Sequence, residues 1–169
     1  MTREELLDDI GWKLLRELQG NGRISYRSLS RKVKLTSSQV AKRMEWMTAA
    51  GIITGYIAEV DPKTFGLPVT AFIRMSVTGN NFGRVTRLVR QSPEVFECHR
   101  GTAADSFIMK VHLRDVEQLE RIVGRFTPFG RVVATVMTSA PVKRRKLTRE
   151  LLKSLLGERA CPSTRKRNK

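Results

Sequence analysis

Carboxylates are scarce in this chain. Its 169 residues include 16 Asp and Glu against 32 Lys and Arg, and the formal net charge is +16 at pH 7. A solvated surface does not need so much charge of one sign, and an excess of this size favours a polyanionic partner. Nucleic acid is the first partner to consider, and an anionic membrane surface is the second.

Cysteines and long apolar runs are scarce as well. Cys98 and Cys161 lie far apart and outside any ligand motif, which argues against a disulfide framework or a thiolate metal cage. No apolar run approaches the roughly 18 residues that a membrane-spanning helix needs. The N-terminal stretch MTREELLDDI lacks the continuous apolar segment of a signal peptide. We therefore expect a cytoplasmic protein, associated with the nucleoid if it binds DNA, that holds no metal and no other cofactor.

The positive charge is concentrated at two places. Between Asn21 and Met44 there are seven basic residues and no carboxylate. The segment 142–169 has eleven Lys and Arg against two Asp and Glu. Its basic clusters, Lys143–Lys146 and Arg165–Arg167, contain no aromatic residue and so lack the stacking groups of single-strand binders. Composition alone leaves two roles open for this segment, a solubilising tail or a nucleic-acid contact.

Hydrophobic periodicity predicts three short helices in the first part of the chain. They are expected over residues 8–20, 26–34 and 37–50, with the N-caps Asp8, Ser25 and Thr36. Thr36 and Gln39 fit a capping box, and Gly51 fits a left-handed stop. Three helices with brief connections are typical of a helix-turn-helix unit. Residues 52–60 are expected to continue the chain as a strand.

The stretch DPKTFGLP, residues 61–68, predicts a boundary because it contains two Pro and one Gly. Beyond it, the periodicity predicts strands over 69–77, 94–100, 105–113 and 131–139 and helices over 82–89 and 116–126. This βαββαβ order is that of a ferredoxin-like sandwich with helices on one face of the sheet. Apolar side chains on the other face, including Phe72, Ile108 and Val133, lead us to expect a homodimer formed through the sheets.

The expected fold class is therefore α+β. The expected divisions are a helix-turn-helix domain at 1–60, a linker at 61–68, a ferredoxin-like domain at 69–141 and a basic C-terminal tail at 142–169. Within the tail, the leucines from Leu147 to Leu155 predict one short amphipathic helix that ends near Gly157. The last stretch, CPSTRKRNK, is expected to be disordered.

Three stretches of the sequence are distinctive: LDDIGWKLLRELQGNGRIS, LTSSQVAKRMEWMTAAGIITGY and ECHRGTAADSFIMKV. Together they resemble the leucine-responsive and asparagine-responsive (Lrp/AsnC) family of prokaryotic transcription regulators, and the resemblance runs from about Leu7 to Lys146 without a gap. It implies a winged helix-turn-helix domain and, after it, a ferredoxin-like, RAM-type domain for effector binding and oligomerisation. It also implies dimers that often assemble to octamers and that bind double-stranded DNA near promoters.

Residues 36–46 are expected to form the recognition helix. A helix with a capped N-terminus enters the major groove with its early residues toward base edges, while the preceding helix crosses the backbone. The predicted DNA-facing side chains are Ser37, Ser38, Gln39, Lys42 and Arg43. The predicted phosphate contacts on the preceding helix are Arg27, Arg31 and Lys32. Gln39 is expected to bond an adenine edge, whereas Arg43 has the alternative of an ion pair inside its own domain.

Two residues of the first helix depart from the family pattern. Gly11 stands where the family usually has Asp, and an interior glycine costs about 0.5 to 1 kcal/mol relative to alanine. Trp12 replaces a residue that is usually polar, so we consider it a candidate interface contact.

The candidate effector loop departs from the family pattern too. After the His-Arg pair the family often has T-G-x-x-D, and its glycine and acidic residue help to bind an amino acid at a subunit interface. Here Thr102 matches, Ala103 replaces the glycine and Ser106 replaces the acid. Asp105 lies one place earlier and would point to the opposite face of a strand. Whether this loop binds an amino acid, another small effector or nothing stays open.

Two other functions are compatible with the sequence. The basic tail would also suit a nucleoid or RNA-associated protein that binds without sequence preference. Some relatives with this architecture are sirohaem decarboxylases, which rely on His and Arg. However, His99 is predicted to lie opposite about Phe107 and His112 opposite about Glu94, too far apart to share a metal. Since no convergent catalytic site appears, we do not expect an enzyme.

Overall fold

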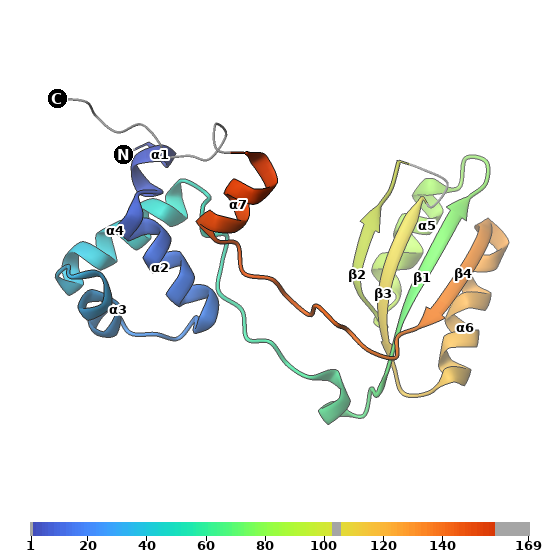
Figure 1. The fold of residues 1–169 in the computed structure, drawn as a ribbon. Helices are drawn as coiled ribbons and strands as arrows, with labels where there is room; N and C mark the ends of the chain where they lie inside the picture. The colour runs from blue at the N-terminus through green and yellow to red at the C-terminus, as the bar shows by residue number, and fades with distance from the viewer. Residues whose placement is uncertain (1, 103–105, 158–169) are drawn as a thin grey trace. The chain divides into compact units, whose positions relative to one another are not determined.

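The computed structural model describes residues 2–102 and 106–157, which form parts of two compact units (Figure 1). One unit combines the chain up to Ala58 with the segment that begins at Val142, and the other spans Glu59–Pro141. Each unit has its own hydrophobic core. The described part of the C-terminal segment therefore groups with the N-terminal helices.

The N-terminal unit begins with four helices. They are α1 (Arg3–Leu6), α2 (Asp9–Gly20), α3 (Tyr26–Val33) and α4 (Ser37–Ala49). The helices α2 to α4 confirm the three predicted from periodicity, whereas the single turn of α1 is too short for a periodic signal. The predicted N-caps are also confirmed, because each side-chain oxygen accepts a bond from a first-turn backbone N–H: Asp8, Ser25 and Thr36.

The core of this unit is apolar and draws on all four helices. Its buried side chains are Leu6, Leu14, Leu29, Val33, Val40, Met44, Met47 and Ile53. The helix α4 supplies three of them, at positions four and three residues apart, which is the spacing of one helical face. Just beyond α4, Gly51 adopts a φ of 68°, which confirms the predicted left-handed stop. The opposite face of α4 is thereby turned to solvent.

The strand predicted over residues 52–60 is wrong. This segment pairs with no strand in the described part of the chain. A strand needs a hydrogen-bonded partner, and the chain turns instead into a short 3-10 helix, η1 (Pro62–Phe65). The apolar alternation that suggested a strand leaves Ile57 78% exposed and Val60 59% exposed.

The second unit is a four-stranded antiparallel sheet covered on one face by helices (Figure 1). Its elements are β1 (Val69–Val77), α5 (Phe82–Gln91), β2 (Val95–Arg100), β3 (Phe107–Leu113), α6 (Val116–Phe126), a 3-10 turn η2 (Thr127–Phe129) and β4 (Gly130–Val136). The strand order is β2-β3-β1-β4. This arrangement confirms the ferredoxin-like βαββαβ prediction and, with the helices of the first unit, the α+β fold class.

The two faces of the sheet differ in burial. On β1, Ala71, Ile73 and Met75 are fully buried beneath the helices. Phe72, which points the other way because side chains alternate along a strand, is 37% exposed. Ile108 on β3, which is paired with Arg74, is 36% exposed. The predicted apolar groups on the open face are therefore present.

The helix predicted in the C-terminal segment is present as α7 (Arg149–Leu156), and Gly157 comes directly after it. Cys161 and the cluster Arg165–Arg167 lie outside the described residues. Among the helices that the structure describes, none combines the length and the apolar character needed to cross a bilayer.

Candidate nucleic-acid interface

The start of α4 is held by reciprocal hydrogen bonds. The N–H of Gln39 donates to Thr36 Oγ1 at 3.2 Å, and the N–H of Thr36 donates to Gln39 Oε1 at 2.9 Å. This confirms the predicted capping box. The bonds fix the first turn and occupy the side-chain oxygen of Gln39. A bidentate contact with adenine needs both that oxygen and the NH₂ group, so Gln39 would have to leave the capping box to make one.

Small polar and cationic side chains line the solvent side of α4. The exposed residues among those predicted to face DNA are Ser37, Ser38, Gln39 and Lys42. Val40 and Met44, on the other side, are buried at 0% and 2% exposure. The exposed side therefore begins at the capped N-terminus, which is the end that meets base edges in helix-turn-helix proteins.

An aromatic side chain extends this surface, and the sequence analysis did not single it out. Trp46 is 38% exposed, and the Nζ of Lys42 lies 5.1 Å from its ring centroid. The spacing of four residues on one helix was the available signal. A cation over an indole ring gains about 0.5 to 1 kcal/mol at exposed sites. The contact restricts where the ammonium group of Lys42 can reach.

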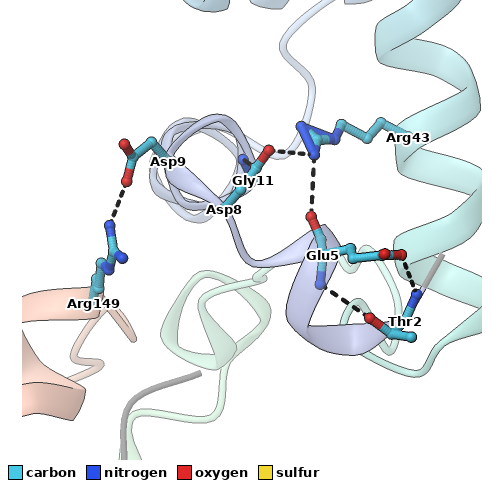
Figure 2. Close-up of polar contacts among 7 residues, drawn as sticks. All are labelled: Thr2, Glu5, Asp8, Asp9, Gly11, Arg43 and Arg149. Atoms are coloured by element: carbon cyan, nitrogen blue, oxygen red, sulfur yellow. Dashed lines mark hydrogen bonds and ion pairs between the residues drawn. The ribbon is translucent and has the colours of Figure 1, made fainter. Parts of the chain in front are cut away.

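Arg43 lies inside the domain, not on the solvent side of α4 (Figure 2). It is 9% exposed, and its Nη2 donates to Asp8 Oδ2 at 2.6 Å and to the backbone oxygen of Glu5 at 3.3 Å. The other carboxylate oxygen of Asp8 accepts from the N–H of Gly11 at 2.7 Å. The alternative that Arg43 forms an ion pair within its domain is confirmed, so we leave Arg43 out of the surface offered to DNA.

The basic residues of α3 differ in their partners. Arg27, Arg31 and Lys32 are all exposed. Lys32 forms an ion pair with Glu17, in which Nζ and Oε2 are 2.5 Å apart. Within the described part of the chain, Arg27 and Arg31 form no ion pair. These two guanidinium groups thus keep their full positive charge for a ligand.

The structure describes only part of the candidate effector loop. Ala103 and Asp105 lie outside the described residues. Thr102 is exposed, whereas Ser106 is tied into the sheet because its Oγ accepts from the N–H of Val77 at 3.2 Å. A structural role for Ser106 therefore accounts for its position at the edge of this loop.

A guanidinium group lies beside the same loop and was not among the predicted effector residues. Arg100 ends β2 and is exposed. Its guanidinium carbon lies 5.2 Å from the ring centroid of Phe82 and 5.7 Å from that of Phe107. The two rings hold this cation directly before Gly101 and Thr102. The His-Arg pair of the sequence was the signal for it.

The histidines are held apart on the sheet. His99 is paired with Ile108, one place from the predicted Phe107, while the N–H of His112 donates to the backbone oxygen of Glu94 at 3.2 Å. Cys98 packs against the core, and burial raises the pKa of its thiol. The described residues contain no group of three His, Cys, Asp or Glu side chains that could hold a metal ion.

His112 sits in a polar contact and an aromatic contact. Its Nδ1 lies 3.0 Å from Thr70 Oγ1, and its ring meets that of Phe96 edge-on with centroids 4.6 Å apart. The side chain is 8% exposed. Burial is the main cause that lowers the pKa of His112, and the nearby charge of Lys110 lowers it further.

Both units of this chain match known protein families. The family model described as winged helix-turn-helix DNA-binding matches residues 7–54, and the Lrp/AsnC ligand binding domain matches residues 70–149. The HTH-type transcriptional regulator LrpC of Bacillus subtilis is 30% identical over 133 residues, which are 79% of this chain and 92% of that protein. The proline dehydrogenase transcriptional activator of Rhodobacter capsulatus is 30% identical and covers 78% of this chain and 88% of that one.

Two solved structures are similar to this chain over most of its length. The structure of B. subtilis LrpC has a TM-score of 0.75 at 29% identity, covering 82% of this chain and 99% of that chain. The transcriptional regulator NMB0573/L-Met complex from Neisseria meningitidis has a TM-score of 0.76 at 25% identity, covering 88% of this chain and 99% of that chain. With both domains matched in order, this chain belongs to the Lrp/AsnC family of transcription regulators.

Proposed function

We propose that this chain regulates transcription by recognising particular DNA sequences through the first turns of α4. The observation that carries the proposal is the capped start of that helix, where small polar side chains and Lys42 face solvent. A helix fixed in this way enters a major groove without first having to order its own N-terminus. The protein acts in the cytoplasm at the nucleoid and has no enzymatic role.

The exposed side chains divide into two roles. Ser37 and Ser38 meet base edges, because they are short and stand at the start of the helix. Lys42 reaches a guanine edge or a phosphate. Arg27 and Arg31 on α3 bind phosphates, which fixes the register without specifying a sequence. Lys32, whose charge is partly offset by Glu17, adds less than the other two.

We extend the proposal to a homodimer formed through the open sheet face, on which octamers of the kind implied by the family resemblance would build. Exposed Phe72 and Ile108, together with half-buried Val133, support this interface. Two copies of α4 related by a two-fold axis predict a pseudo-palindromic site. Its half-sites should lie about 34 Å apart, one turn of DNA, or a multiple of that distance.

We also propose that a small effector with a carboxylate, such as an amino acid, modulates this regulator. The guanidinium group of Arg100 beside the loop at 101–106 supports the carboxylate, since Arg pairs with carboxylates in a bidentate manner. A similar protein from Neisseria meningitidis is described as a complex with L-Met. The replacement of the family's Asp by Ser106 indicates that the preferred side chain differs here.

The proposal is tested by selecting genomic fragments that the purified protein binds, with and without pooled amino acids. We expect enrichment of fragments that share a pseudo-palindromic element, and a change in enrichment when the right amino acid is present. Recovery of fragments without any shared element would favour the alternative, a basic nucleoid protein that binds regardless of sequence. Enrichment that is the same in both pools would count against the effector only.

A further inference from the structure

The C-terminal helix α7 and the residues before it are docked on one side of α2. The side chain of Gln19 brackets the backbone of Leu147, accepting from its N–H at 2.7 Å and donating to its oxygen at 2.8 Å. The Nη2 of Arg16 lies 3.3 Å from Glu150 Oε1. Arg149 forms an ion pair with Asp9 (Figure 2). These contacts span the length of α2, so α7 is held at several points.

Trp12 lies on the same side of α2. It stands three residues after Asp9 and four before Arg16, which is the spacing of one helical face. Trp12 is 8% exposed, although it does not belong to the buried cluster of the first four helices. The side of α7 that carries Leu151 and Leu152 is half-buried. We infer that α7 covers the indole ring, which explains why an aromatic residue stands at this position.

Most of α7 lies beyond the part of the chain that the family models match, whereas its partners on α2 lie within it. The match to the Lrp/AsnC ligand binding domain ends at residue 149, where α7 begins. The helix nevertheless joins the N-terminal unit, not the sheet unit from which the chain has just come. Residues 142–148 therefore already belong to the N-terminal unit, and Gln19 holds them at Leu147.

Docking places Lys146 next to the end of α2. A methyl group built on Gly20 would lie 2.9 Å from the Nζ of Lys146, so the ammonium group sits at the C-terminus of that helix. A cation is favourable there because the helix dipole is negative at its C-terminus. Arg144 and Arg145 are exposed and form no ion pair with the described residues. Beyond the end of α2, the chain passes through Arg23 to the start of α3.

We propose that residues 142–157 form a docked arm whose Arg144 and Arg145 bind DNA phosphates beside the groove that α4 enters. The docked arm brings Arg144, Arg145 and Lys146 to the same unit as the basic residues of α3 and α4. Because α7 orders the arm before DNA arrives, less conformational entropy is lost on binding than with a free tail. The contact adds affinity and not sequence preference. This inference rests on the proposed function, since α4 selects the site.

The first experiment removes the charges of Arg144 and Arg145 and keeps the contacts between α7 and α2. The dissociation constant of Arg144→Gln/Arg145→Gln is measured on a selected duplex over a range of salt concentrations. The slope of log affinity against log salt should fall by about 0.9 for each lost phosphate contact. The matched control is Arg84→Gln/Arg87→Gln, which removes the same charge from exposed positions on α5. A slope that stays unchanged, or falls equally in the control, overturns the docked arm.

The second experiment weakens the contacts that hold the arm on α2 and keeps Arg144 and Arg145. Gln19→Ala/Glu150→Gln removes the bonds to Leu147 and the ion pair with Arg16 while making the protein more positive. Hydroxyl-radical footprinting of the wild-type protein should show protected sugars flanking those covered by α4. In the variant, the flanking protection should weaken and the central protection should remain, although added positive charge alone would strengthen both.

These experiments distinguish refutation of the docked arm from refutation of the proposed function. Absence of any central protection in the wild-type protein would refute the proposed function. Central protection with flanking protection that is equal in wild-type, Arg144→Gln/Arg145→Gln and undocked proteins would refute the docked arm alone. Thermal unfolding monitored by circular dichroism, run on each variant, establishes that the helices are retained.

Discussion

The carboxylate of Asp8 connects two helices at once. One oxygen caps α2 through the N–H of Gly11, and the other accepts from Arg43 on α4. Because the side chain of Asp8 is 44% exposed, solvent screens the ion pair, and its contribution is on the order of 1 kcal/mol. The pair ties α4 to the start of α2, so Arg43 has a structural role and is not a contact for DNA.

Gln39 permits a test that separates capping from base recognition. Gln39→Glu keeps an oxygen for the capping box but removes the NH₂ donor that an adenine contact needs. If Gln39 reads a base, the variant should keep its melting temperature and lose about 1 to 3 kcal/mol of preference at one base pair. Binding to a panel of duplexes with single substitutions measures this. Weaker binding by the same factor on every duplex would restrict Gln39 to the cap, since an added negative charge repels all DNA alike.

At the scale of elements, local signals were sufficient where the element is self-contained. The start of α4 was predictable because Thr36 and Gln39 act within one turn, and its end was predictable because Gly51 stops the helix locally. The strand over 52–60 was predicted wrongly because pairing depends on a distant partner that its own residues do not reveal. Arg43 was placed on the DNA face for a related reason. Its partner Asp8 is 35 residues away, and helical spacing alone does not show which cation turns inward.

The β1–β3 pair carries a pH-sensitive group. Burial holds the pKa of His112 below its ordinary value, so the unfolded chain binds a proton more readily than the folded one. Stability should therefore be complete above about pH 6.5, the ordinary histidine value, and should decline as the pH falls through the lowered folded pKa. The check is thermal unfolding between neutral and mildly acidic pH, comparing wild-type protein with His112→Gln. The two curves should converge at low pH; parallel curves would contradict the prediction.

At the scale of the whole molecule, the N-terminal unit is built from both ends of the described chain. The sheet unit is inserted between them and connects to the helices at its beginning and its end. The sequence indicated both the helix at the C-terminus and the unusual Trp12. It did not indicate that they belong together, because Trp12 and Leu151 are far apart in the chain and meet only after folding. The basic segment was for the same reason treated as a tail.

Because α7 belongs to the N-terminal unit, we expect the N-terminal helices to lose stability when α7 is removed. A chain ending at Pro141 should expose Trp12, and losing the burial of a large apolar side chain costs about 1.5 to 3 kcal/mol. The measurement is tryptophan fluorescence and denaturant unfolding in a Trp46→Phe background, so that Trp12 alone reports. Its emission should shift to longer wavelength, and the transition of the helical unit should move to lower denaturant.

A chain ending at Gly157 is the matched control for this truncation, because it keeps α7 and lacks only residues 158–169. It should retain the fluorescence and the unfolding midpoint of the full chain. If both truncated chains behave alike, α7 does not cover Trp12, and the dock on α2 contributes nothing to the domain. If only the shorter chain is destabilised, the stable helix-turn-helix unit includes α7, and its sequence does not stop before the linker at 61–68. An excised fragment 1–60 would then underestimate the stability of the intact domain, and its DNA affinity as well.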